Sequence, residues 1–240
     1  MRTRMIFSIL GVLACAVSPG HAGFYDSITE IMARPSEQHP DDGTLISGLK
    51  QALSIGTENA VNSVSKMDGY LGNKAIKILL PEKIQEAADV LSKLGYEDKV
   101  DAFILSMNRA AEKAAPQAVS FFVDAIKEMT FEDAKGILNG GDTAVTEFFE
   151  SKTRDKLYDA FKPIVSSSMD EVNVTQAYKE MMGKYTSAVP FAGTESLDLD
   201  HYVTTKSLDG LFYMVGQEEK KIRTDPAARV TNLLKETFQN

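Results

Sequence analysis

The chain has 240 residues, a formal net charge of −8 and one cysteine. This length is ample for a hydrophobic core, but it does not distinguish one large domain from two small ones. The acidic balance disfavours nucleic acid as a partner, because it repels the phosphate backbone and no cluster of lysines and arginines reverses it locally.

The first 22 residues have the layout of a secretory signal peptide. Arg2 and Arg4 precede an apolar run over residues 5–17, and a small-residue cleavage site ends at Ala22. The apolar run is shorter than the roughly twenty residues that span a bilayer, and no later run is longer. We therefore expect residues 1–22 to be removed during export, and we expect no transmembrane segment.

Cys15, the lone cysteine, lies inside this signal. Cleavage after Ala22 leaves a mature chain with no thiol, no disulfide and no cysteine metal ligand. The residues around Cys15 also loosely resemble a lipobox, in which Cys15 would become the lipidated first residue. A lipid anchor at Cys15 is thus an alternative to a free N-terminus at Gly23, and an intact mass distinguishes the two.

The N-terminal part of the mature chain alternates helical and broken patterns. Residues 23–33 have the pattern of a short amphipathic helix, and residues 34–43 that of a linker. Apolar residues keep helical spacing over residues 44–67, for about six turns. The pattern breaks at residues 68–73, and residues 75–80 form an apolar run before a proline, typical of a lone strand or a buried loop.

The middle of the chain contains the clearest helix signals. A helix predicted over residues 82–94 ends at Gly95, a suitable left-handed residue after a helix. Two apolar helical repeats follow and meet near Pro116, which can begin a helix. Thr130 and Asp133 resemble a capping box that starts a short third helix, which a double glycine ends.

The C-terminal part contains further helical segments separated by polar or proline-containing breaks. We expect a helix capped by Asp142 with a bend at 151–153 or Pro163, a helix over 174–185, a surface loop over 186–199, a helix from Asp198 or Asp200 to Ile222, and a final helix from Asp225 to Phe238. The sequence therefore predicts an all-α fold, a single multi-helix bundle of about eight or nine helices, with residues 44–240 as the helical domain.

Two polar groups within apolar helices are candidate ligand-binding residues. Arg109 and Asn108 lie three and four residues before Glu112, so Glu112 can meet either on one helix face. Such a group can hold an anionic or polar ligand, or it can be an intrahelical salt bridge with an interhelical hydrogen bond. Glu219 and Arg223, four residues apart, form a second group that can bind a ligand or fix the angle between two helices.

Common catalytic, nucleotide and metal motifs are missing. The sequence has no phosphate-binding glycine loop, and His39 and His201 have no paired histidine or nearby thiol, so we expect no cofactor and no metal. Aromatic pairs occur in three helices, where adjacent side chains point about 100° apart. One member of each pair can face the core while the other faces a groove; the pairs are Phe121–Phe122, Phe148–Phe149 and Phe212–Tyr213.

Five ordered strings cover nearly the whole mature chain: ISGLKQALSIGTENAV (46–61), GYLGNKAIKILLPE (69–82), MNRAAEKAAP (107–116), FVDAIKEMTFEDAKGILNGGDTAVTEFF (122–149) and YVTTKSLDGLFYMVGQEEKKIRTDPAARVTNLLKETF (202–238). Together they resemble the bacterial family catalogued as domain of unknown function 4197. The resemblance implies an exported, mainly helical protein of the periplasm of Gram-negative bacteria, with a mature start near Gly23. It implies no established activity and supplies no catalytic residue.

The leading hypothesis is a periplasmic binding or interaction module without catalysis, whose partner is an unknown protein or small molecule. One alternative is a periplasmic enzyme that uses Glu112 or Glu219 as an acid or base beside Arg109 or Arg223. Another is an envelope structural protein tethered through Cys15.

Overall fold

The computed structural model describes residues 40–171, 174–188 and 198–224. Helices dominate these residues and no strand occurs among them, which confirms the all-α class. The elements are α2 (Pro40–Ser65), α3 (Glu82–Lys93), α4 (Glu97–Ala114), the 3-10 turn η1 (Ala115–Gln117), α5 (Ala118–Glu128), α6 (Phe131–Asn139), α7 (Ala144–Glu171), α8 (Val174–Ala188) and α9 (Leu199–Thr224). The predicted signal peptide, the helix over 23–33 and the final helix after Asp225 lie outside the described residues.

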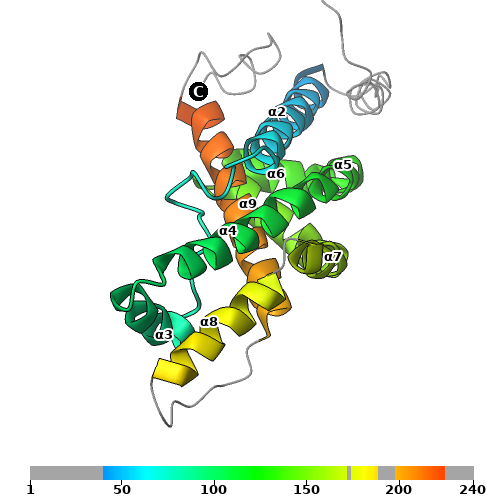
Figure 1. Ribbon diagram of the computed structural model, residues 1–240. Coiled ribbons are helices and arrows are strands. Elements are labelled where there is room, and N and C mark those ends of the chain that lie inside the picture. Colours follow the sequence, from blue (N-terminus) through cyan, green and yellow to red (C-terminus); the bar gives the residue numbers. More distant parts are fainter. Residues whose placement is uncertain (1–39, 172–173, 189–197, 225–240) are drawn as a thin grey trace, which may run out of the picture. The chain divides into compact units, whose positions relative to one another are not determined.

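Helix α9 is central to the described helices. It packs along α7 and α2, and α4 crosses it, as Figure 1 shows with α9 in orange and α4 in green. The fully buried ring of Phe122 on α5 meets Phe149 of α7 edge-on, with ring centroids 5.0 Å apart, and Phe212 of α9 at 6.1 Å. These aromatic contacts join three helices at the core.

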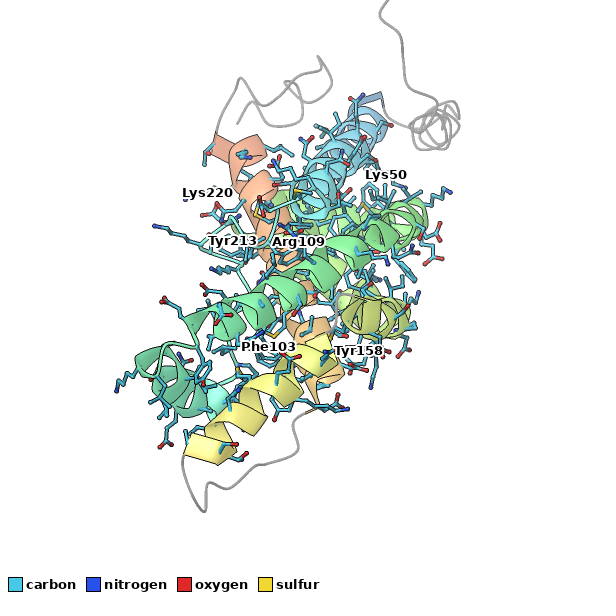
Figure 2. All side chains as sticks on the ribbon, in the orientation of Figure 1. Lys50, Phe103, Arg109, Tyr158, Tyr213 and Lys220 are labelled. Carbon is cyan, nitrogen blue, oxygen red and sulfur yellow. The ribbon has the colours of Figure 1, made fainter. Side chains whose placement is uncertain are left out.

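The aromatic pairs do not all divide between core and surface. Phe122, Phe149 and Phe212 are buried, and Phe148, which is also buried, packs edge-on against Phe149. Tyr213, by contrast, is 45% exposed, and Figure 2 labels it on α9. Thus the pair on α9 has one core member and one member on an open surface.

The chain ends α3 and begins α6 with the local signals that the sequence contains. Gly95 has φ +84°, and the N–H of Tyr96 donates to the carbonyl of Leu91 at 2.9 Å, as in a Schellman motif. Thr130 and Asp133 form the predicted capping box at the start of α6. Both predictions are confirmed.

Other boundaries differ from the predicted ones. Helix α2 begins at Pro40, four residues before Thr44, because proline fits the first helical turn and the acidic residues after it suit a helix N-terminus. Helix α7 is continuous through Pro163, with no break at 151–153. Proline removes only one backbone donor, and the buried face of α7 keeps its spacing through Leu157, Phe161, Val165 and Met169.

The connection between α2 and α3, residues 66–81, lies against both α4 and α9; we call it the 66–81 segment. It enters through a turn in which Asp68 has φ +62°, and a Cβ at Gly69 would lie only 2.5 Å from the carbonyl oxygen of Val64. The predicted lone strand or buried loop over residues 75–80 is a largely buried connection with no strand pairing in the described chain.

The ring of Tyr70 fixes the segment to α9. Tyr70 is fully buried, and its hydroxyl donates to the carbonyl of Ser207 at 2.6 Å. A Cβ at Gly210 would lie 2.6 Å from the Tyr70 ring and 3.1 Å from the Cβ of Ile76. A glycine on α9 is therefore what allows the segment to approach this closely.

We predict opposite effects for two helical glycine substitutions. Gly210→Ala destabilises the protein by about 1–3 kcal/mol, because the added methyl group overlaps the buried Tyr70 ring. Gly183→Ala in α8, where a Cβ meets nothing within 4 Å, stabilises it by about 0.5–1 kcal/mol through helix propensity. Urea unfolding of both variants measures this, and equal effects would contradict the close approach at Gly210.

Candidate functional site

Glu112 on α4 is buried and accepts hydrogen bonds from the 66–81 segment. Its Oε1 accepts from the backbone N–H of Tyr70 at 3.1 Å and of Leu71 at 3.4 Å. Its Oε2 accepts from Arg109 at 2.5 Å. The buried charge is thus compensated by two backbone donors and one guanidinium, as a buried carboxylate requires.

Arg109 links Glu112 to the turn at the start of the segment. Its second terminal nitrogen donates to Asp68 Oδ1 at 2.7 Å. The hydrogen bond with Glu112 raises the pKa of Arg109, with a smaller contribution from Asp68. Figure 2 labels Arg109 on α4. The guanidinium therefore bridges two carboxylates from different elements.

Asn108, fully buried, binds the same segment further along. Its Oδ1 accepts from the N–H of Ile78 at 2.9 Å, and its Nδ2 donates to the carbonyl of Ile78 at 2.8 Å and to that of Ile104 at 2.8 Å. The side-chain amide thus satisfies both backbone groups of one residue. Asn108, Arg109 and Glu112 are brought together, and the groups that they bind belong mainly to the 66–81 segment.

Glu219 and Arg223, both on α9, form a second junction of the same kind. Glu219 accepts from the backbone N–H groups of Val145 and Thr146 at 2.9 and 3.0 Å, and from the Thr146 hydroxyl at 2.9 Å. Arg223 donates to Glu219 and to the carbonyl of Ile137 at 3.1 Å. A buried carboxylate on α9 therefore caps α7 and, through Arg223, also joins the end of α6.

This capping differs from the sequence-based prediction. Helix α7 begins at Ala144, so Asp142 lies two residues before it. The N–H groups of its first turn bind Glu219, which is more than seventy residues away in the sequence. Local capping rules could not identify this partner. Helix α9, in contrast, has a local cap, since Asp198 rather than Asp200 accepts from the N–H of His201 at 2.9 Å.

A small apolar cavity lies beside the Glu219 junction. It is lined by α2, α9 and Val145 of α7, and Glu219 and Arg223 are among its lining residues. Its volume is about 20 Å³, which is room for about one water molecule. Among the described residues, this cavity beside Glu219 and Arg223 is therefore too small for a substrate.

A much larger groove lies between the end of the 66–81 segment and α9; we call it the α9 groove. Its volume is about 690 Å³, within the range typical of small-molecule sites. The residues that line it are Ala75, Ile76, Lys77, Ile78, Leu79, Leu80, Glu82, Tyr202, Lys206, Asp209, Gly210 and Tyr213. None of the five residues singled out from the sequence lines this groove.

Two apolar side chains on opposite walls of the α9 groove are open to solvent. Leu79 is 57% exposed on the segment, and Tyr213 is 45% exposed on α9. The Tyr202 hydroxyl donates to the carbonyl of Leu79 at 3.0 Å and so ties the walls together at one point. Burial raises the pKa of Tyr202, with the charge of Glu82 adding to the shift.

The charges in the α9 groove are unevenly paired. Asp209 binds Arg154 of α7, and Lys206 reaches Asp209 only at 3.5 Å. Burial alone would lower the pKa of Arg154, but its hydrogen bonds to Asp209 and Glu150 raise that pKa overall. Lys77 has no ion-pair partner among the described residues. The groove thus offers Lys77 to an incoming group, and Lys206 is shared with Asp209.

The apolar run AIKILLP, which ends in a proline, is the sequence signal for a non-helical wall here, and the structure shows that burial alternates along it. Ile76, Ile78 and Leu80 are buried, whereas Leu79 is exposed. Period-two alternation in an otherwise helical chain indicates an extended stretch. The opposite wall leaves no such signal, because Tyr202, Lys206 and Tyr213 have ordinary helical spacing.

The described residues contain no group of three or more histidine, cysteine or acidic side chains arranged to hold a metal ion. None of the helices in the same residues is long and apolar enough to cross a membrane.

Together these features define an all-α domain in which two buried carboxylate–arginine junctions hold its elements around α9 and leave an open groove beside it. A family model described as "Protein of unknown function (DUF4197)" matches residues 39–239. The chain therefore belongs to this family, as its sequence strings predict. No curated protein and no solved structure shows significant similarity to it.

We predict that Glu112→Gln destabilises the protein by about 3 kcal/mol. The substitution removes the charge that compensates Arg109 and places an amide group against the N–H groups of Tyr70 and Leu71. Urea unfolding gives the free energy. Glu180→Gln is the matched control: it breaks an exposed pair with Lys99 and should leave stability unchanged.

The buried phenol of Tyr70 leads us to predict that the folded protein loses stability at alkaline pH. Burial, with the charges of Glu112 and Asp209 adding to it, raises the pKa of the Tyr70 phenol well above its ordinary value near 10. The unfolded chain therefore releases this proton first as the pH rises, which favours unfolding above about pH 10. Below that pH, the protonated Tyr70 phenol makes its full contribution to the stability of the folded protein.

Tyr70→Phe measures this contribution. At pH 8 the variant is less stable by about 1 kcal/mol, because the carbonyl of Ser207 loses its donor. By pH 11 the difference from the wild type narrows by about 1 kcal/mol, since the variant has no phenol to ionise at this position. Urea unfolding across this pH range would contradict the assignment if the difference stayed constant.

Proposed function

We propose that the protein is an exported binding protein without catalysis, and that it holds its ligand in the α9 groove. The observation that carries this proposal is the groove itself, with a volume of about 690 Å³ and two exposed apolar side chains, Leu79 and Tyr213, on opposite walls. Exposed apolar groups gathered at a concave surface favour a binding site. Lys77 and Lys206 add donors that can fix a ligand's orientation.

Export to the periplasm is supported by the N-terminal sequence. Arg2, Arg4, the apolar run and the small residues before Gly23 follow the order of a signal peptide. The alternative, in the same compartment, is a chain that is anchored to the membrane through a lipidated Cys15 and not released by cleavage after Ala22. The intact mass of the mature protein separates the two.

The geometry favours binding over acid–base catalysis at the buried carboxylates. Both oxygens of Glu112 accept hydrogen bonds from within the protein, and so do both oxygens of Glu219. A general base needs an oxygen within reach of the substrate proton that it removes. In this arrangement the carboxylates act on neighbouring backbone groups, and their role is to position the walls of the site.

Native mass spectrometry of the full mature chain, purified from its own compartment, tests the proposal. We expect the wild type to carry a bound molecule, and we expect Leu79→Ser to lose most of it. Removing the exposed leucine from the groove wall weakens apolar contact enough to lower affinity about tenfold.

Leu94→Ser is the matched control, since Leu94 is 53% exposed, ends α3 and is not a groove residue. It should retain the bound molecule. A wild type that is persistently empty, or equal occupancy in all three proteins, would overturn the proposal.

A further inference from the structure

We infer that the α9 groove binds a small zwitterion, with its negative end at Lys77, its positive end at Glu82 and its apolar body over Leu79. This inference deepens the proposed function and rests on it. It follows from the way in which the four charged side chains that line the groove are paired.

Two of the four lining charges are already neutralised. Arg154 of α7 donates to Glu150 and to the groove's Asp209. Lys206, also a groove residue, reaches Asp209 at 3.5 Å. Two cations thus face two carboxylates in one network. This network has no net charge left for a ligand to neutralise.

The other two lining charges, Lys77 and Glu82, are opposite in sign and unpaired. Neither forms an ion pair with any residue that the structure describes, and they do not pair with each other. A ligand of one sign would satisfy only one of them and would face the other as a like charge. A ligand that carries both signs can satisfy both.

Lys77, Leu79 and Glu82 follow one another along one wall of the groove. Burial alternates from Ile76 to Leu80, so the side chains of Lys77 and Leu79 lie on the same open face, about 7 Å apart along an extended backbone. Glu82 comes three residues later, as the first residue of α3. In chain order the cation and the anion are therefore separated by the exposed leucine.

Contacts with α9 show the same separation. A Cβ at Gly210 would meet Ile76, whereas the carbonyl of Leu79 receives the hydroxyl of Tyr202, about two turns earlier on the helix. Burial raises the pKa of Tyr202, and the nearby charge of Glu82 adds to the shift. Glu82 thus lies towards the Tyr202 end of the groove, and the segment next to Ile76 lies towards the Gly210 end.

Apolar side chains complete the surface that faces the ligand. The Tyr202 hydroxyl binds only the backbone of Leu79, so the leucine side chain stays open to solvent. Tyr213 adds a largely exposed ring on the opposite wall. Covering these groups favours a ligand with an apolar body. Its two charges then belong at opposite ends of that body and not on a single carbon.

The test titrates 8-aminooctanoate into the full mature chain at neutral pH and follows the backbone amide signals in NMR. Octanoate and octylamine have the same chain length and lack one charge each, and the isomer 2-aminooctanoate carries both charges at one end. We expect each of the three to bind about fivefold more weakly than 8-aminooctanoate, because each loses one exposed ion pair.

Charge reversal in the protein gives a sharper test. Lys77→Glu and Glu82→Lys should each weaken binding of 8-aminooctanoate about tenfold, since each places a like charge at one end of the ligand. The double variant should bind within about twofold of the wild type, because the ligand can lie in the reverse direction. Lys74→Glu is the matched control: Lys74 is exposed and is not a groove residue, so binding should be unchanged.

No binding of 8-aminooctanoate, equal binding of octanoate or octylamine, or a double variant as weak as the single variants would overturn the zwitterion inference. If these probes fail but Leu79→Ser still removes a co-purified molecule, the groove remains the binding site and only the ligand class is wrong. If Leu79→Ser removes nothing, the proposed function fails as well.

Discussion

Burial of two negative charges is the constraint on which the rest of the structure depends. Glu112 and Glu219 each lose their hydration in the folded state. Hydrogen bonds from backbone N–H groups of another element and from one arginine replace the lost water contacts. An unpaired carboxylate at either position would cost several kcal/mol, so the partner elements have to occupy these places. Glu112 thereby fixes the 66–81 segment, and Glu219 fixes the start of α7.

The α9 groove is a consequence of how the 66–81 segment is held. Glu112 fixes its first turn, Asn108 fixes its extended part, and the Tyr70 ring lies where Gly210 leaves room on α9. Helices alone would close against one another, as α7 and α9 do. Along the 66–81 segment, Leu79 stays exposed and forms one wall of the groove.

The pairs Arg109–Glu112 and Arg223–Glu219 stabilise the fold, and this role indicates which residues remain free to bind a ligand. Arg109 is bound by two carboxylates, and Arg223 by one carboxylate and a carbonyl of α6. They position the walls and helix ends, while the exposed groups of the α9 groove remain available to a ligand. This separates the residues that build the fold from those that we propose to bind a ligand.

The sequence by itself determined the all-α class and the local helix signals, such as Gly95 after α3 and the Thr130–Asp133 capping box. These features depend on residues within one or two turns, so spacing is enough to identify them. The spacing also predicted that Arg109 and Glu112 could pair. Only the tertiary structure decided what that pair holds, because Tyr70 is 42 residues away from Glu112. The tertiary structure also decided that the α9 groove exists. Its two walls are more than a hundred residues apart in the sequence, and long-range packing, which no local pattern encodes, brings them together.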